Sequence, residues 1–295
     1  MYEKSITREY RTAFVILIDQ SGSMVELVEY EGIKISKSEA VALATNQILS
    51  ELIERAKRHD GIRDYYDVAV IGYSGAGVRS MLTPEGSSED DSPFVSIKEL
   101  EAVENVDHME YDVIYKDPQG EDFAHTISAP KWVSPQHTGE TPTFEVLNYT
   151  YDWVKRWCSK PENHNSFPPI IFNITDGESS DCTPDDFVNI SRKLRSLSTS
   201  DGNVFVINIH LATPTEEGSH QSMIFPTSDE VECCCHTKAK DLSRASSVMP
   251  SLYRDQICEL RGINTQGEFV GVSYNSSIAE LITILNIGTI SVKKG

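Results

Sequence analysis

The chain has 295 residues, of which 39% are hydrophobic and 8% aromatic, so it can bury a core and does not have the composition of a disordered chain. Its 45 acidic residues outnumber 26 basic ones, which gives a formal net charge of −19. Nucleic acids and anionic membranes are bound by clustered Lys and Arg, so this balance argues against both as partners. Part of the acidity could instead attract cations or a basic partner.

The sequence shows no targeting segment, because its first apolar run, 13–18, is too short for a signal core. No run reaches the about 18 apolar residues that a membrane helix needs. Six cysteines stand at 158, 182, 233, 234, 235 and 258, and three adjacent cysteines do not suit an ordinary disulfide framework. We therefore expect reduced thiols and a cytoplasmic location.

Unbroken apolar runs predict strands that are buried on both faces of a parallel sheet. The runs are Thr12–Asp19, 67–73, Ile170–Thr175 and 204–211, with a weaker fifth at 269–273. Helical patterns lie between them. A capping box, Ser36 with Glu39, opens the first helix, and Thr141-Pro142 opens the second with Pro142 at its first position. Pro184 begins a third, and 277–286 forms the last.

Strands that alternate with helices predict an α/β fold with a doubly wound, mostly parallel sheet flanked by helices. Segment 83–136 departs from this pattern, with five prolines and the acidic run 89–91. Within it, 111–115 and 123–127 flank Asp117-Pro-Gln-Gly120, which has the residues of a type I turn. We expect one domain over 1–295, with an insertion at approximately 83–136 that contains a β-hairpin. A second irregular stretch is expected at 213–236.

The first strand ends in Asp19-Gln-Ser21-Gly-Ser23. Its three oxygen-bearing side chains at alternate positions of a turn can converge on one point, and small oxygen ligands suit Mg²⁺ or Mn²⁺ better than zinc. Taken alone, the same residues are also those of an ordinary loop. Ligands of doubly wound sheets bind beyond the carboxyl ends of the strands, which is where this loop lies.

This loop resembles the metal-ion-dependent adhesion site (MIDAS) of von Willebrand factor A (VWA) domains, which are Rossmann-like. Gly139-Glu-Thr141-Pro142 stands where that family has its metal-binding threonine, and Thr175-Asp176-Gly177 matches its second acid. The stretch 245–250 and Gly288 add a weaker likeness to intracellular bacterial members.

The resemblance implies metal ligands at five positions. Ser21 and Ser23 would bind Mg²⁺ (or Mn²⁺) through their hydroxyls, Thr141 directly or through water, and Asp19 and Asp176 through coordinated waters. Thr138 and Thr143 lie near Thr141, which is preferred because Pro142 places it at a helix N-cap. An open metal position would then accept an Asp or Glu carboxylate of a protein partner. Residues 178–181 are expected to form a solvated rim.

The function that the resemblance implies is metal-dependent protein binding without enzymatic activity. It also implies an intracellular stress or signalling assembly, with a partner such as an ATPase, a kinase or a phosphatase. A metal-dependent phosphoester hydrolase and a metal-free scaffold are the alternatives. The sequence lacks a G-x-S-x-G elbow, a phosphate-binding P-loop and H-E-x-x-H, and His137 is the nearest candidate base. Cys233 to Cys235 with His236 could bind a structural zinc or be redox-active, but the spacing favours plain thiols.

Overall fold

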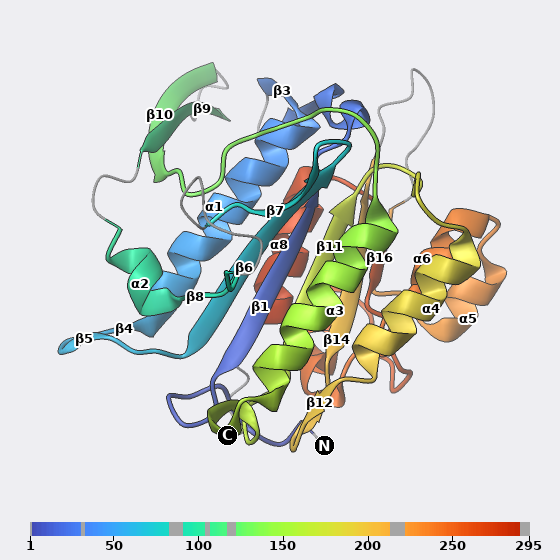
Figure 1. The fold of residues 1–295 in the computed structure, drawn as a ribbon. Helices are drawn as coiled ribbons and strands as arrows, with labels where there is room; N and C mark the ends of the chain where they lie inside the picture. Colours follow the sequence, from blue (N-terminus) through green and yellow to red (C-terminus); the bar gives the residue numbers. More distant parts are fainter. Residues whose placement is uncertain are drawn as a thin grey trace.

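The computed structural model describes residues 2–30, 33–82, 91–103, 107–116, 122–212 and 222–289. Its centre is a mixed, mostly parallel sheet (Figure 1). The parallel strands, in spatial order, are β16 (Val272–Ser276), β14 (Phe205–Leu211), β11 (Ile170–Thr175), β1 (Thr12–Asp19) and β6 (Tyr66–Ser74). Antiparallel strands complete the edges: β7 (Gly77–Ser80) and β8 (Val95–Ser96) pair with β6, and β15 (Met223–Ile224) pairs with β16. The predicted α/β doubly wound class is confirmed.

Helices cover both faces of the sheet, as the alternating side chains of β1 illustrate. Phe14, Ile16 and Ile18 join one apolar cluster, which includes α1 (Lys37–Ala56) and α8 (Ile278–Thr289). Val15 and Leu17 join the other, with α3 (Thr143–Ser159), α4 (Pro184–Arg195) and α6 (Thr237–Ala245), which lie in front in Figure 1. Burying each such side chain contributes about 1.5–3 kcal/mol, which is why an unbroken apolar run is selected here.

The helix starts follow local capping chemistry. At α1, the Ser36 hydroxyl accepts from the Glu39 N–H at 3.2 Å, and the Glu39 carboxylate accepts from the Ser36 N–H at 2.8 Å, as the capping box predicted. The expectation for α3 was wrong by one position. Its N-cap is Pro142, which has no side chain to accept a hydrogen bond, and Thr141 lies one residue before the cap.

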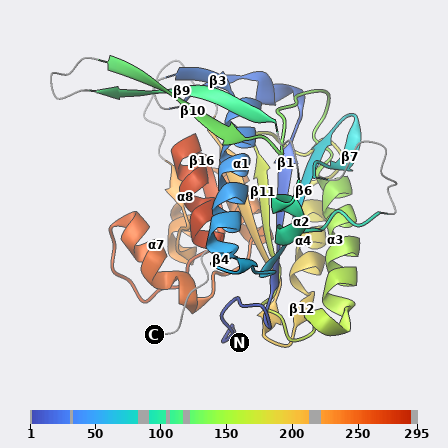
Figure 2. The ribbon, with the colours of Figure 1, turned by 90° about the vertical axis from the view of Figure 1, so that its left-hand side faces the viewer.

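The insertion contains the expected hairpin, built from antiparallel β9 (His108–Lys116) and β10 (Asp122–Pro130). The predicted turn at 117–120 lies outside the described residues. Figures 1 and 2 show the hairpin at the same end of the molecule as the carboxyl end of β1, beside β3 (Ile33–Ser36). The insertion therefore lies near the loop that follows β1. It also contains the short helix α2 (Ile97–Glu101).

Two sequence expectations differ from the structure near the C-terminal half. The weak fifth strand is β16, which begins at Val272, while Phe269 and Val270 form only isolated bridges. The stretch expected to be irregular at 213–236 contains β15 and α5 (Ser228–Cys233) among its described residues, 222–236. The remaining elements are short: β2 (Leu27–Tyr30), β4 (Lys57–Arg58), β5 (Gly61–Ile62), β12 (Ser198–Thr199), β13 (Gly202–Asn203) and α7 (Arg254–Arg261).

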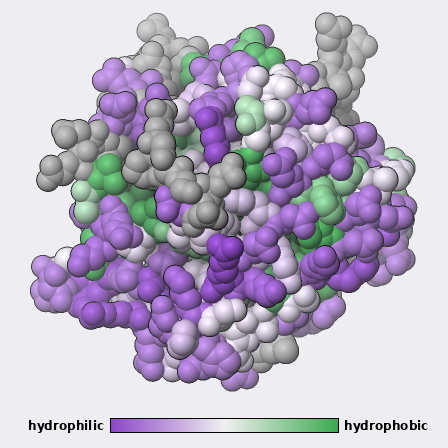
Figure 3. All heavy atoms as spheres, in the orientation of Figure 1, coloured by the Kyte–Doolittle hydropathy of each residue, from purple (hydrophilic) through white to green (hydrophobic). Residues whose placement is uncertain are grey.

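The face of the molecule drawn in Figure 3 is mostly hydrophilic, with small and separate apolar patches. None of the helices in the described part of the chain is both long and apolar enough to cross a membrane.

Candidate metal centre

The candidate site lies at the carboxyl ends of β1 and β11, where the order of the sheet reverses. The chain passes from β1 to β6 on one side and later to β11 on the other, so β1 and β11 lie at the switch point of the sheet, where doubly wound sheets bind their ligands. Asp19 is the last residue of β1, and Asp176 directly follows β11. The topology alone therefore brings the two acids together although they are 157 positions apart in the sequence.

All five predicted site residues are clustered at this switch point. The Ser23 hydroxyl donates to Asp176 Oδ1 at 2.7 Å and lies 3.1 Å from the Ser21 hydroxyl oxygen. A Cβ placed on Gly177 would have Thr141 Oγ1 at 3.4 Å, and Asp19 Oδ2 and Ser23 Oγ both at 3.9 Å. The oxygens of Asp19, Ser23 and Thr141 thus surround one small space, which stays open because residue 177 is glycine.

Asp19 is fully buried and both of its carboxylate oxygens accept hydrogen bonds. Oδ1 accepts from the Ser21 N–H at 2.9 Å, and Oδ2 accepts from the Thr175 hydroxyl at 2.6 Å. Burial raises the pKa of Asp19, the bonds from Thr175 and Ser21 lower it in part, and the nearby charge of Asp176 raises it further. A divalent cation would relieve this destabilised negative charge.

Asp176 is held by a lysine that the sequence analysis did not select. Lys37 Nζ lies 2.8 Å from Asp176 Oδ2, and both side chains are fully buried. The same ammonium lies 2.6 Å from Glu26 Oε2, on a carboxylate that is 43% exposed. Hydrogen bonds and ion pairs therefore run from Ser21 through Ser23 and Asp176 to Lys37.

Backbone contacts fix the Thr141 loop against the loop after β1. The Gly22 N–H donates to Gly139 O at 2.9 Å, and the Thr138 N–H donates to Gln20 O at 2.6 Å. Gly139 has φ +71°, and a Cβ there would lie 2.9 Å from the Gly75 Cα, so both its dihedral and its surroundings require glycine.

Of the three threonines considered, Thr141 has its hydroxyl beside the oxygens of Asp19 and Ser23 that surround Gly177. Thr138 is exposed, and Thr143 is buried as the first residue of α3. The Thr141 hydroxyl makes no hydrogen bond to any described residue, whereas its backbone exchanges two bonds with Ser180 at 3.1 and 3.0 Å. The backbone is anchored and the hydroxyl remains available for a ligand.

The donor set fits a hard divalent cation such as Mg²⁺ or Mn²⁺, because it consists of three hydroxyls and two carboxylates. Across the described ranges, no three or more His, Cys, Asp and Glu side chains are grouped so that they could hold a metal ion. The candidate site contributes only two such groups and depends on hydroxyls for the rest. The assignment of Asp19, Ser21, Ser23, Thr141 and Asp176 as metal ligands stays a prediction.

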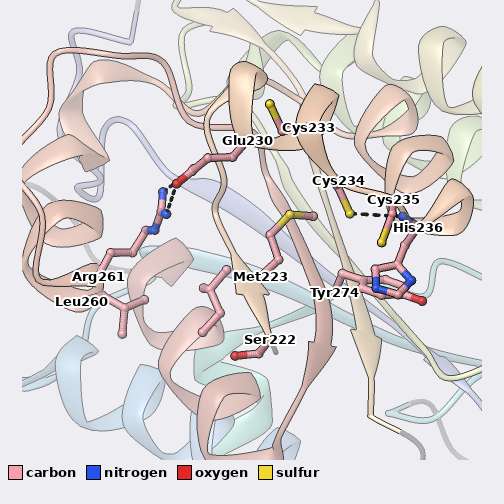
Figure 4. A pocket seen from close by; sticks show the side chains of 11 residues that line it. Ser222, Met223, Glu230, Cys233, Cys234, Cys235, His236, Leu260, Arg261 and Tyr274 are labelled. Atoms are coloured by element: carbon pink, nitrogen blue, oxygen red, sulfur yellow. Dashed lines mark hydrogen bonds and ion pairs between the residues drawn. The ribbon is translucent and has the colours of Figure 1, made fainter. Parts of the chain in front are cut away.

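The cysteines do not gather into the zinc site that was considered. All six are free thiols. Cys233, Cys234, Cys235 and His236 line a pocket of about 540 Å³, and Figure 4 shows the Cys233 sulfur apart from those of its two neighbours. Cys234 Sγ accepts from the His236 backbone N–H at 3.4 Å. This arrangement is that of separate thiols at the junction of α5 and α6.

Sequence reasoning missed three residues that organise the site. Thr175 was quoted at the end of a strand beside Asp176 but was given no role of its own, although its hydroxyl donates a hydrogen bond to Asp19. Asp181, expected to be solvated, accepts from the Phe144 and Glu145 N–H groups at 3.0 and 2.9 Å and so caps α3 in place of Pro142. Lys37 had one sequence signal: it is a cation in the first turn of a helix, where the helix dipole disfavours positive charge.

No family model matches the sequence, and no curated protein matches it. Among solved structures, the chain is similar to a von Willebrand factor type A protein from Catenulispora acidiphila, with 15% identity and a TM-score of 0.39 over 69% of this chain and 34% of that one. It is similar to the SpRpn10 VWA domain, with 11% identity and a TM-score of 0.38 over 70% and 77% of the two chains.

A third match is proximal thread matrix protein 1 from the mussel byssus, described with a zinc occupied MIDAS motif. The identity is 12% and the TM-score 0.40, over 95% of this chain and 47% of that one. The chain thus spans about a third of the first protein and about half of the third. At TM-scores this low, the likenesses carry no argument about the site, and its function must be inferred from its own geometry.

Proposed function

We propose that the chain is a protein-binding module of the VWA type, without enzymatic activity, that uses a divalent metal to bind an Asp or Glu carboxylate of a protein partner. The observation that carries this proposal is the convergence of Asp19, Ser21, Ser23, Thr141 and Asp176 around one small space at the switch point of the sheet. A divalent cation held there, Mg²⁺ or Mn²⁺, would supply a Lewis-acidic centre with a position left for the partner.

The hydrogen bonds of the carboxylates support a division of roles. Both oxygens of Asp19 and both oxygens of Asp176 already accept hydrogen bonds from protein groups. The hydroxyls of Ser21, Ser23 and Thr141 are therefore proposed to touch the ion, while the two acids supply charge around it. A cation with few direct carboxylate ligands retains affinity for a carboxylate of the partner.

The absence of an enzymatic role is supported by the partners of the serines. Ser23 donates to Asp176 and lies beside Ser21, so these hydroxyls are engaged within the site. His137, the candidate base, is exposed and contacts the hydroxyl of Ser38 at 3.3 Å. All six cysteines are free thiols, which supports work in a reducing compartment such as the cytoplasm. The partner there is proposed to be an ATPase, a kinase or a phosphatase.

Gly177→Ala tests the metal site directly. Its methyl group would meet only ordinary contacts of 3.4 Å or more, so the fold should persist, but it would fill the space among the site oxygens. We expect Mn²⁺ binding, followed by electron paramagnetic resonance, to weaken at least about tenfold, or about 1.4 kcal/mol. The control is Gly22→Ala, whose methyl group lies 3.6 Å from Gly139 O. Equal Mn²⁺ affinity in the wild type and Gly177→Ala would contradict the assigned site.

Partner binding is tested by capture in MgCl₂ and release by EDTA. Ser21→Ala with Ser23→Ala should abolish capture and, by removing the bond to Asp176, destabilise the protein by about 1.5–3 kcal/mol. Ser273→Ala with Ser276→Ala removes another buried hydroxyl pair, outside the site, and should leave capture intact. Capture that survives in EDTA would show that partner binding does not need the metal.

A further inference from the structure

A cavity of about 330 Å³ opens directly beside the candidate metal centre. Thr175 and Gly177 of the site form one side of it, and α4 and α6 form the other, with apolar walls from Phe187 and Leu242. Its volume is near the lower end of ligand-binding pockets. A group that binds in the cavity would therefore be a neighbour of a group bound at the metal.

Lys238 lines this cavity and makes no direct ion pair with any described residue. It is half-buried, and it forms neither a hydrogen bond nor an ion pair with any described side chain. Burial lowers the pKa of Lys238, and the negative charges of Glu178, Asp176 and Asp19 raise it in part. Asp241, which also lines the cavity, is instead paired with Arg244 at 3.1 Å.

Metal loading changes the charge balance around the cavity. The carboxylates of Asp19, Asp176, Glu26 and Glu178 outnumber the ammonium groups of Lys37 and Lys238 by two, so these groups are together negative without a metal. A bound divalent cation would neutralise this excess, and the carboxylates that it engages would then offset less of the charge of Lys238. One carboxylate at the metal leaves Lys238 without a partner, and a second anionic group beside the first would pair with it.

We propose that the cavity is a second subsite for the same partner, in which Lys238 pairs with a glutamate side chain next to the carboxylate that binds the metal. Phe187 and Leu242 would contact the methylene groups of that glutamate, which makes glutamate a better fit than the shorter aspartate. The proposal rests on the proposed function, and it names the partner as a segment with at least two acidic residues.

Three acetylated peptide amides test this subsite by calorimetry in saturating Mg²⁺: Glu-Glu-Glu, Gln-Glu-Gln and Asp-Asp-Asp. The wild type should bind Glu-Glu-Glu at least about tenfold more tightly than Gln-Glu-Gln. This is the gain in affinity expected from one charge-assisted hydrogen bond, between Lys238 and the second glutamate. This exceeds the threefold statistical advantage of having three acids. Asp-Asp-Asp should fall between the two.

Lys238→Met should reduce the preference for Glu-Glu-Glu to about threefold or less, and Mg²⁺ binding should be retained because Lys238 lies outside the site. The matched control is Lys240→Met, two positions along α6 and outside the cavity, which should keep the full preference. A preference that persists in Lys238→Met, or falls equally in Lys240→Met, overturns the subsite. If the wild type binds Glu-Glu-Glu no more tightly than Gln-Glu-Gln, the subsite is refuted but carboxylate binding at the metal is not. If no peptide binds, both the subsite and the proposed function are refuted.

Discussion

Replacing Lys37 with methionine is expected to destabilise the protein in EDTA by about 3–5 kcal/mol, the usual cost of removing one partner of a buried ion pair. Lys37 Nζ and Asp176 Oδ2 are 2.8 Å apart, and neither side chain is exposed. Methionine keeps much of the apolar stem, but among the described residues it leaves the Asp176 carboxylate with only the hydrogen bond from Ser23. The second pair, with the 43% exposed Glu26, adds little because solvent screens it.

The free energy of unfolding is measured by urea denaturation of Lys37→Met, Asp176→Asn and the double variant. The double variant has no unpaired buried charge, so its loss should be smaller than the sum of the single losses by at least about 1 kcal/mol. Lys34→Met, at an exposed position of β3, is the control and should change stability by no more than about 0.5 kcal/mol.

Magnesium provides an independent readout of the same charge. A divalent cation in the site should neutralise the Asp176 carboxylate that Lys37 no longer pairs, so MgCl₂ should raise the stability of Lys37→Met more than that of the wild type. Additive losses in the double variant, or a loss below about 1 kcal/mol in Lys37→Met, would refute the view that Lys37 stabilises the site by charge.

Two further predictions concern ionisable groups elsewhere. Burial, with the charge of Lys238, lowers the pKa of His210 to about 3 from 6.5. Above pH 6.5, His210 is neutral in both the folded and the unfolded protein. Between pH 6.5 and about 3 it is protonated only in the unfolded protein, so the free energy of unfolding should fall by about 1.4 kcal/mol per pH unit on acidification. Urea denaturation should show this slope reduced in His210→Gln, and an unchanged slope would contradict it. Burial also raises the pKa of the Cys158 thiol to about 12, while Cys233 and Cys235 are exposed. Iodoacetamide at pH 8 should therefore alkylate Cys233 and Cys235 well before Cys158, as peptide mass spectrometry would show, and equal rates would contradict this.

The strands of the sheet were predictable where burial dictates composition. β1 and β11 are buried at every position, so their sequences are unbroken apolar runs and their bounds match the prediction. β16 is only partly buried at Tyr274 and Asn275, so its pattern is weaker and its predicted position was shifted by three residues. The helix α5 was missed although Thr227 and Glu230 form its capping box, because only six residues follow that signal.

The site was predictable to the extent that each residue follows the end of a strand or precedes a helix. Asp19, Ser21 and Ser23 form a local pattern, and parallel strands bring Asp176 to the same edge. The contacts that hold these residues were not predictable, because they join distant segments: Lys37 pairs with Asp176 across 139 positions, and Asp181 caps a helix that begins 38 positions earlier. Such pairs depend on how the loops pack, which no single segment encodes.

The way in which the loops are held suggests how metal loading acts. Gly22 and Gly139, and Thr138 and Gln20, are joined through their backbones, and the Thr141 loop is joined to Ser180 in the same way. None of these bonds involves an ion, so removal of the metal should change the charge of the site more than its shape. Partner binding would then be switched chiefly by charge, through the metal and Lys238 together. We therefore expect the amides of Gly22 and Thr138 to exchange hydrogen at nearly equal rates in MgCl₂ and in EDTA.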